Sequence, residues 1–235
     1  MKLISTELRF ARQQVLKAFR WSLKPPSKSL TLWNFNELSE DHNPESDLDI
    51  DWVSASDASV GGLSHCTFER NGKTAVFKGE IKLNPNGETK ERGYCAIRGT
   101  VPRMNTDLSD YEGLELKIRA DNNVYALNVR ARTMFPDDLY QGFLRVEGDD
   151  AVEVQLPFEK LVLTSFGVQK LVNRAIPDDR ISHIGITFIA EQDTPFKLEI
   201  ESIGAYVNES VDSSEFEKRT FETARKERIQ LAIAK

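Results

Sequence analysis

The chain has 235 residues, of which 40% are hydrophobic and 29% are charged, as in an ordinary globular protein that buries one core. Its formal net charge of −6 argues against a protein that binds nucleic acid through a broad basic face. No apolar run approaches the roughly 20 residues that a membrane-spanning helix needs.

Residues 1–24 show the spacing of an amphipathic helix. Apolar side chains recur every three or four residues from Ile4 to Phe19, and basic side chains occupy the other side. Pro25 and Pro26 end this pattern, because a proline inside a helix donates no hydrogen bond. We expect a helix and a proline linker over 1–28, with three candidate roles: a mitochondrial targeting segment, a helix on a membrane surface or partner, or a helix packed on its own domain.

From residue 29 to residue 207 apolar and polar residues alternate, which is the period of half-buried strands. The clearest runs are 30–35, 114–119, 125–130, 152–156, 184–188 and 198–201, and segments rich in Asn, Asp, Pro and Gly separate them. One apolar and one polar face on each strand predicts antiparallel sheets in two layers. We therefore expect an all-β domain over 29–207, an antiparallel β-sandwich of the jelly-roll type.

Within this region, Trp52–Ser64 contains a turn that matches no catalytic motif. Ser56 and Asp57 are residue types whose side chains bind nearby backbone N–H groups, and Gly61 and Gly62 tolerate the positive φ of a tight reversal. We expect a fixed structural corner of a sheet protein here.

Two further segments and the two cysteines give additional expectations. Residues 41–51 are acidic and have little to bury, which predicts an exposed loop. After residue 208 the helical period returns, and the capping box Ser214–Glu217 begins a charged helix over 213–233, so 208–235 forms a C-terminal helical segment. Cys66 and Cys95 are too few for a disulfide framework, so we expect two free core thiols, with a single bridge between them as the alternative.

The sequence offers few groups for catalysis. His42, His65 and His183 lie far apart, and the chain has no nucleophile elbow, P-loop or dinucleotide-binding glycine pattern. We expect His183 to order the edge of a sheet. Glutamates on the strands alternate with core residues on faces expected to be wet, whereas a glycosidase needs an acid whose pKa is raised by apolar surroundings. We predict no catalytic residue, no cofactor and no metal site.

Arginines recur at strand positions that could share one outer face, namely Arg98, Arg119, Arg130, Arg132 and Arg145. Three tyrosines lie near them in the pattern: Tyr94, Tyr125 and Tyr140. Such side chains on a sheet face are frequent anchors of protein interfaces, and aromatic rings also stack on sugars. Cross-strand pairing with Glu115 and Glu147 on a solvated sheet explains the same pattern without a ligand. Charge pairing, protein docking and sugar binding therefore all remain open.

Several short sequence pieces of the β region are each weak signals, but their combination in this order is specific for one family. They include Leu30–Phe35, Trp52–Val53, Phe77–Gly79, Gly93–Ile97, Leu108–Leu114, Tyr125–Arg130, Tyr140–Gln141, Leu156–Phe158 and Pro195–Ile200. In this order they resemble the complex I intermediate-associated protein 30 family. The resemblance gives a structural role to Trp52, Ser56, Asp57, Gly61, Gly62, Ser64, Gly93, Tyr94 and Gly113.

The resemblance implies a jelly roll similar to galactose-binding and carbohydrate-binding modules, with no established catalytic site and no cofactor. It further implies an assembly factor for mitochondrial NADH:ubiquinone oxidoreductase, located in the matrix and peripheral to the inner membrane. The expected partners are complex I subunits, assembly intermediates and other assembly factors, including an acyl-CoA-dehydrogenase relative, with no nucleic acid among them.

We expect partners to be bound by a strand face that carries Arg98, Arg119, Arg130 and Tyr140. The alternative function is that of a sugar-binding protein similar to carbohydrate-binding modules. Sugar binding would require Trp33 and Trp52 to be exposed, and we expect both to be buried.

Overall fold

The computed structural model of the protein describes residues 29–36, 52–87, 91–102, 107–135, 137–146, 150–165, 167–171 and 174–207. The helices predicted at 1–24 and 213–233, and the acidic segment 41–51, lie outside these residues. Leu30–Tyr206 form one compact unit, which is described below.

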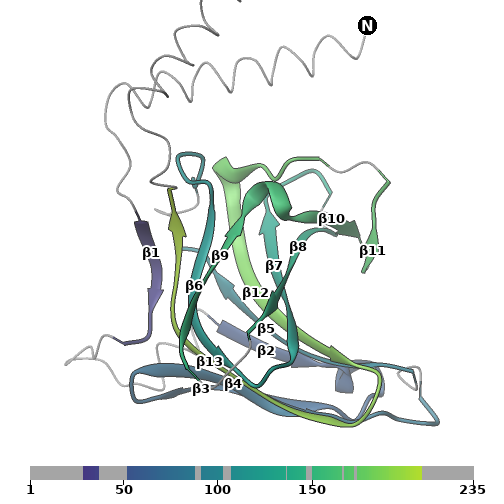
Figure 1. Ribbon diagram of the computed structural model, residues 1–235. Helices are drawn as coiled ribbons and strands as arrows, with labels where there is room; N and C mark the ends of the chain where they lie inside the picture. The colour runs from purple at the N-terminus through teal and green to yellow at the C-terminus, as the bar shows by residue number, and fades with distance from the viewer. Residues whose placement is uncertain are drawn as a thin grey trace, which may run out of the picture. The chain divides into compact units, whose positions relative to one another are not determined.

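The unit consists of two antiparallel β-sheets, here called sheet A and sheet B (Figure 1). Sheet A contains β1 (Ser29–Asn34), β3 (His65–Asn71), β4 (Thr74–Ile81), β6 (Gly113–Ala120), β9 (Val152–Pro157) and β13 (Thr194–Tyr206). Sheet B contains β2 (Trp52–Ser56), β5 (Gly93–Thr100), β7 (Val124–Ala131), β8 (Asp138–Arg145), β10 (Val162–Ser165), β11 (Val168–Gln169) and β12 (Ile181–Ala190). Among the described residues the helices are short 3-10 turns: η1 (Asp57–Val60), η3 (Phe158–Lys160) and η4 (Asp178–Arg180).

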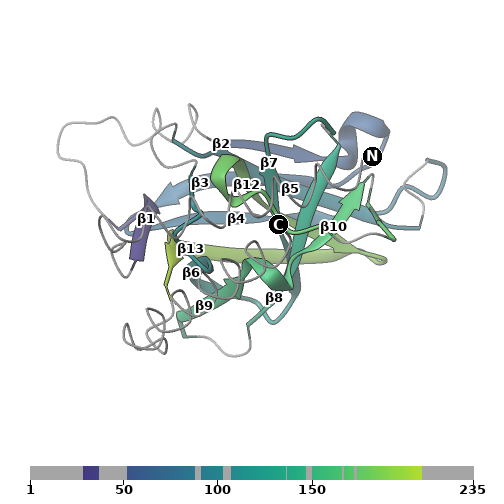
Figure 2. The ribbon, with the colours of Figure 1, turned by 90° about the horizontal axis from the view of Figure 1, so that it is seen from above.

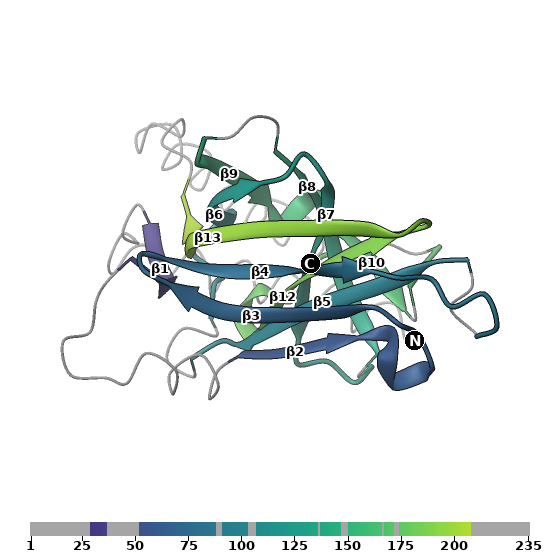
Figure 3. The same ribbon diagram turned by 90° about the horizontal axis from the view of Figure 1, so that it is seen from below.

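The last two described strands, β12 and β13, are interior strands of sheet B and sheet A, respectively. Sheet A has the order β3-β4-β13-β6-β9, with β1 also paired to β13, and sheet B has the order β11-β10-β8-β7-β12-β5-β2. Seen from below, β13 runs beside β4, and β3 lies on the other side of β4 (Figure 3). In sheet B, β12 pairs with β7 on one side and β5 on the other, and Figure 2 gives the view from above. The alternation in the sequence is therefore the signature of two sheets that each cover one side of a shared core.

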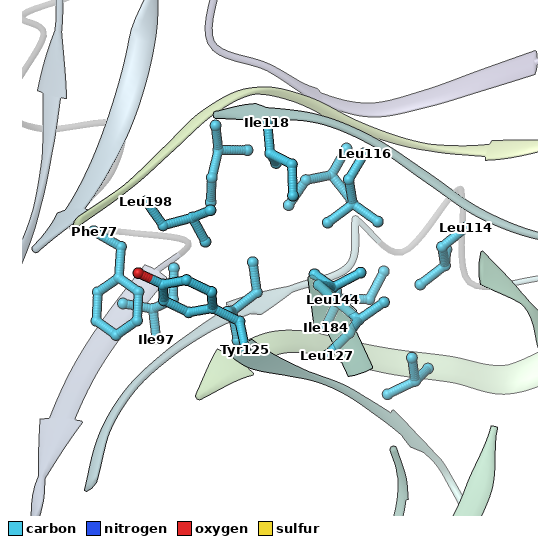
Figure 4. Packing of buried hydrophobic residues seen from close by; sticks show 14 of the residues in the cluster. Phe77, Ile97, Leu114, Leu116, Ile118, Tyr125, Leu127, Leu144, Ile184 and Leu198 are labelled. Carbon is cyan, nitrogen blue, oxygen red and sulfur yellow. The ribbon is translucent and has the colours of Figure 1, made fainter. Parts of the chain in front are cut away.

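The inner faces of the two sheets form this core. Phe77, Leu116 and Leu198 from sheet A lie opposite Ile97 and Leu127 from sheet B, and all of them are buried (Figure 4). Burial of an apolar side chain of this size stabilises the fold by roughly 1.5–3 kcal/mol. The predicted antiparallel sandwich is confirmed.

Trp33 and Trp52 belong to the same core, as expected. Their side chains are only 8% and 4% exposed. The two rings meet edge to face, with centroids 5.1 Å apart. Phe68 lies against Trp52 at 5.0 Å. These rings are packing residues of the sandwich.

The predicted corner is built around the buried carboxylate of Asp57. The backbone N–H of Ser64 donates to Asp57 Oδ1 at 3.0 Å, and the Ser64 hydroxyl and the Tyr94 N–H donate to Oδ2 at 2.7 and 3.1 Å. Ser64 Oγ in turn accepts a hydrogen bond from the Lys82 N–H at 3.1 Å. Because Ser64 and Lys82 flank strands of sheet A while Tyr94 belongs to sheet B, this carboxylate joins the two sheets.

Two neighbouring motif residues, Ser56 and Gly61, shape the turn itself. Ser56 Oγ accepts a hydrogen bond from the Ala58 N–H at 3.3 Å, and Gly61 has a φ of +83°. Gly93 serves a different need, since a Cβ there would lie 2.7 Å from Asp57 Oδ2. These residues belong to the motif that carries the family resemblance, and the structure shows the contact between Gly93–Tyr94 and the turn.

The two cysteines meet across the sandwich as free thiols. Cys95 is buried, as expected, but Cys66 is only half-buried. A hydrogen bond between the two thiols lowers the pKa of Cys66 and, together with burial, raises the pKa of Cys95. The Cys66 thiol also contacts the Ala55 carbonyl at 3.5 Å. The alternative expectation, a disulfide between them, is not what the structure contains.

Candidate functional site

The two outer faces of the sandwich are the surfaces on which a functional site could lie, because the inner faces are filled by the core. They differ in charge. Outward positions of sheet A carry both acidic and basic side chains. Outward positions on the described strands of sheet B carry basic side chains and no acidic ones, as the strand register shows.

On the outer face of sheet A the charges pair across neighbouring strands. Arg119 Nη1 lies 3.3 Å from Glu199 Oε2, and Lys197 Nζ lies 2.7 Å from the other oxygen of the same carboxylate. Lys117 and Glu201 form a third pair at 2.6 Å. Lys78 on β4 and Glu69 on β3 form a fourth pair. This arrangement is the cross-strand charge pairing that was one of the three interpretations.

Sheet A also contains one carboxylate pair of like charge. The negative charge of Glu115 raises the pKa of Glu153, which lies on the neighbouring strand. Glu115 Oε2 accepts a hydrogen bond from the Gln155 amide at 2.8 Å. Both glutamates lie on the outer, wet side of the sheet, whereas a glycosidase holds its acid in an apolar pocket.

Sheet B gathers several arginines near one histidine. His183 on β12 lies directly opposite Arg130 on β7, and Gly185, two residues further along the same face, lies opposite Arg98 on β5. Arg132 follows β7 with the same side-chain parity as Arg130. We call Arg98, Arg130, Arg132 and His183 the basic cluster.

The electrostatics of His183 show that these charges converge. Burial lowers the pKa of His183, and the positive charges of Arg98, Arg130 and Arg132 lower it further. Its Nδ1 lies 3.0 Å from the hydroxyl of Ser182, which donates to the Arg130 carbonyl at 3.1 Å. Within the described residues no carboxylate contacts the three arginine side chains. Among the described residues, the positive charge of the cluster therefore has no carboxylate partner.

A polar row crosses the middle of the same face. Gln141 Nε2 donates to Asn128 Oδ1 at 2.7 Å, and Asn128 Nδ2 donates to Thr187 Oγ1 at 2.8 Å. These bonds order the amides of Gln141 on β8 and Asn128 on β7 and the hydroxyl of Thr187 on β12, which are three adjacent strands. A bound chain would therefore meet amide and hydroxyl groups that are already ordered.

Beyond this row lie exposed apolar side chains. The ring of Phe143 on β8 is 72% exposed, and Ile189 on β12 and Val124 on β7 are close to half exposed. The register places Ala126 opposite Phe143, Tyr94 opposite Ile189 and Arg145 opposite Val124, so this end of the face has one arginine beside its apolar and aromatic side chains. We call Phe143, Val124 and Ile189 the apolar group.

The predicted partner-binding residues do not share one face. Arg98 and Arg130 do lie together on sheet B, but Arg119 is on β6 in sheet A, where Glu199 pairs with it. Tyr140 points inward from β8; its side chain is 3% exposed, and its hydroxyl donates to the Ala175 carbonyl at 3.3 Å. The expectation of a common face is therefore wrong for Arg119 and Tyr140, because each strand's parity and sheet decide where its side chains point.

The position of His183 also differs from the expectation. An edge of a sheet was expected for it, yet β12 is an interior strand of sheet B, between β7 and β5. The apolar group and the polar row were not singled out. Phe143 carried a signal that could have found it, since it follows Tyr140 and Gln141 within one strand and has the parity of Gln141.

Other kinds of site receive little support from the described residues. Over these ranges, no group of three or more His, Cys, Asp and Glu side chains is arranged to hold a metal ion. The buried carboxylates there are Asp57, bound in the corner, and Asp138, which is paired with Lys170. Nor does that part of the chain contain a helix with the length and hydrophobicity needed to cross a membrane.

Comparison with known proteins identifies the family. Residues 37–200 match the family described as complex I intermediate-associated protein 30 (CIA30). The chain belongs to the CIA30 family. It is 30% identical over 191 residues to the mouse protein named complex I intermediate-associated protein 30, mitochondrial, and this match covers 75% of the chain and 56% of the mouse protein. This confirms the family resemblance.

A second CIA30 relative gives the same result. The protein of the same name in Drosophila melanogaster is 30% identical over 169 residues, which cover 65% of the chain and 57% of the fly protein. The chain thus spans a little over half the length of these two curated relatives.

Solved structures support the fold. The family 11 carbohydrate-binding module of Clostridium thermocellum, in complex with a beta-1,3-1,4-mixed-linked tetrasaccharide, has a TM-score of 0.54 at 12% identity and covers 76% of this chain and 95% of its own. A second structure of a family 11 module, from a cellulosomal cellulase of the same organism, gives a TM-score of 0.55, also at 12% identity, with 78% and 96% covered. At this identity the likeness concerns the fold alone.

Proposed function

We propose that this CIA30-family protein is a non-catalytic assembly factor for mitochondrial respiratory complex I. It holds assembly intermediates and other assembly factors through the outer face of sheet B. Family membership supports the link to complex I. The uncompensated basic cluster beside exposed apolar side chains supports the choice of face.

The choice between the two faces rests on their charge. Side chains on sheet A, such as Arg119 and Lys117, are already paired, and a partner would have to displace Glu199 or Glu201 to bind them. On sheet B, Arg98 and Arg130 need no such exchange, so binding there meets a smaller desolvation and rearrangement cost. Exposed aromatic and arginine side chains are also the residue types that anchor protein interfaces.

The proposed setting follows from the family. Both curated relatives are named as mitochondrial, and we propose the same compartment for this protein, in the matrix and peripheral to the inner membrane. Its partners there would be complex I subunits and intermediates together with other assembly factors, including an acyl-CoA-dehydrogenase relative.

Sugar binding, the alternative, is less well supported. The fold is that of carbohydrate-binding modules, but a sugar platform needs exposed aromatic rings. Trp33, Trp52, Tyr125 and Tyr140 are all buried, and the most exposed ring on the described outer face of sheet B is that of Phe143, since Tyr94 on the same face is half-buried. One such ring beside a basic cluster suits a polypeptide better than a neutral polysaccharide.

Affinity purification tests the proposal. The tagged full chain, expressed in cells depleted of the endogenous protein, is purified from mitochondria, and the bound proteins are identified by mass spectrometry. We expect respiratory complex I subunits and assembly factors to be enriched over a tagged matrix protein of similar size. Recovery of neither class would refute the proposed function, and retention on mixed-linked glucan resin would support the sugar-binding alternative.

A further inference from the structure

We propose that the basic cluster binds an acidic segment of a partner polypeptide, whose carboxylates pair with Arg98 and Arg130 while an apolar side chain of the same segment covers Phe143. This inference rests on the proposed function for the identity of the partner. The chemistry of recognition rests on the face itself.

The charge of this face selects the chemistry of the ligand. The molecule as a whole carries a net charge of −6, yet the described strands of sheet B present arginines outward with no acidic side chain among them. Arginine binds carboxylate through two parallel hydrogen bonds, which are stronger than those between neutral groups. An acidic ligand would therefore be attracted to this face.

The strand geometry allows successive carboxylates to be held. Arg98 and Arg130 lie on β5 and β7, which flank β12, and neighbouring strands are about 4.8 Å apart, so the two backbones are separated by roughly 10 Å. Between Arg98 and Asn128 lies Gly185, where a Cβ would come within 2.6 Å of the Ile97 carbonyl. Gly185 is buried, and the close approach of β5 to β12 at this point requires a residue without a Cβ.

The remaining groups of the face favour a polypeptide. The ordered amides of Asn128 and Gln141 offer donors and acceptors of the kind that a peptide backbone uses. The apolar group begins on the far side of this row, one side-chain position further along the strands, as shown by the pairing of Ala126 with Phe143. An extended segment with alternating acidic and apolar residues would match both ends.

Two other polyanions fit less well. Nucleic acid binding usually depends on a basic footprint that dominates the charge of a whole domain, and this chain is acidic. Anionic membranes are recognised by clusters of about 4–8 Lys and Arg residues. The described outer strands of sheet B carry arginines but no lysine, and their middle is a row of hydrogen-bonded amides.

Binding of an acidic segment should also change the pKa of His183. The groups that face its ring are Arg98 from β5, Arg130 and Arg132 from β7 and its end, and the Ser182 hydroxyl on its own strand. A bound carboxylate offsets the positive charge of the arginines, so the pKa of His183 rises on binding. By linkage, affinity then increases as the pH falls towards the lowered pKa of free His183.

The experiment measures binding of the full chain to a synthetic peptide of alternating glutamate and leucine. The test variant is Arg98→Glu with Arg130→Glu. The matched control is Lys117→Glu with Arg119→Glu, which makes the same charge change on sheet A. Circular dichroism and thermal unfolding confirm that both variants are folded. We expect the test variant to weaken peptide binding by at least about tenfold and the control to change it by less than about twofold.

Two further readouts separate the ligand classes. A peptide of alternating glutamine and leucine should bind at least about tenfold more weakly than the glutamate peptide. NMR of the His183 ring should show a higher pKa when the glutamate peptide is bound. Equal loss of binding in both variants, an unchanged His183 pKa, or tighter binding to phosphatidylglycerol vesicles or to single-stranded DNA than to the peptide would overturn the inference.

The peptide experiment and the affinity purification can fail independently of each other. If the wild-type chain captures complex I subunits from mitochondria but the peptide binds the two variants equally, the function stands and the acidic-segment inference fails. If the peptide result is as expected but no complex I subunit or assembly factor is recovered, the site stands and the assignment to complex I assembly fails.

Discussion

The outer faces of the two sheets share one backbone geometry but treat charge in opposite ways. On sheet A, Arg119 and Lys117 each have a glutamate partner on the neighbouring strand. On sheet B, Arg98 and Arg130 sit beside a half-buried histidine, and no carboxylate of the described residues contacts them. The arginine and lysine charges on the outer face of sheet A are paired within the sheet, whereas Arg98 and Arg130 on sheet B have no carboxylate partner among the described residues.

The difference shows how a strand arginine should be interpreted. An arginine that is paired across the ladder contributes to the solvation and register of its own sheet. An arginine without such a partner is available to another molecule. The number of arginines on a sheet is therefore a weaker guide to a binding face than their pairing within the sheet.

The largest expected effect tests whether the two faces are held in fixed relation. Asp57→Ala would remove the acceptor for three donors from Ser64 and Tyr94 and leave them buried without partners. At about 1–3 kcal/mol for each buried unsatisfied donor, we expect a loss of at least about 3 kcal/mol of stability, measured by urea denaturation. The control is Ser59→Ala on the exposed side of the same turn, which should change stability by less than about 1 kcal/mol.

The second prediction concerns the apolar group. Phe143→Lys should leave the free energy of unfolding within about 0.5 kcal/mol of wild type, because the ring is 72% exposed. It should weaken capture of mitochondrial partners by about tenfold or more, since an aromatic anchor is lost from the interface. Val60→Lys, at an exposed apolar position on η1, is the control and should capture partners normally. A Phe143 variant that captures partners as well as wild type would exclude this end of the face from the interface.

The third prediction concerns the ion pairs on the outer face of sheet A. A double-mutant cycle on Arg119 and Glu199 should give a coupling energy of about 0.2–1 kcal/mol, as for other exposed ion pairs. Lys197, which shares the carboxylate, keeps the value at the low end of this range. Co-purification of partners should be unchanged in each variant. Loss of partners in the Arg119 variant alone would mean that sheet A also binds them.

The smallest effects have opposite signs on the two faces. The pKa of His183 is lowered, so the unfolded chain takes up a proton more readily, and stability relative to His183→Gln falls as the pH drops through about 6.5. The pKa of Glu153 is raised, so the folded chain takes up the proton more readily, and stability relative to Glu153→Gln rises as the pH drops through that raised pKa towards about 4.5. Thermal unfolding across this range checks both slopes, and slopes of the same sign would contradict the comparison.

Much of the fold was predictable from alternation and turn chemistry. The runs at 114–119, 125–130 and 184–188 each lie inside an observed strand, and Trp33 and Trp52 are buried as expected. The period of two follows from the pleat alone, so a single strand reveals it without any tertiary information.

The site was only half predictable, because alternation does not say to which sheet a strand belongs. The turn at 121–123 suggests a hairpin, and strands that follow each other in sequence are often paired. Here β6 pairs with β13 and β9 in sheet A, whereas β7 pairs with β12 and β8 in sheet B. Arg119 and Arg130 are therefore separated by the whole sandwich although they lie close in sequence. Pairing partners come from contacts distant along the chain, which no local pattern contains.

The position of β12 and β13 has a consequence for how the domain is made. Without Ile181–Tyr206, sheet A divides between β4 and β6 and sheet B between β5 and β7. During translation the earlier strands thus emerge from the ribosome as separate hairpins and pairs, and the two layers can close only when the last segment has been synthesised. A premature stop codon anywhere before this segment would remove the middle of both layers at once, so we expect such truncated products to be degraded instead of accumulating as smaller domains.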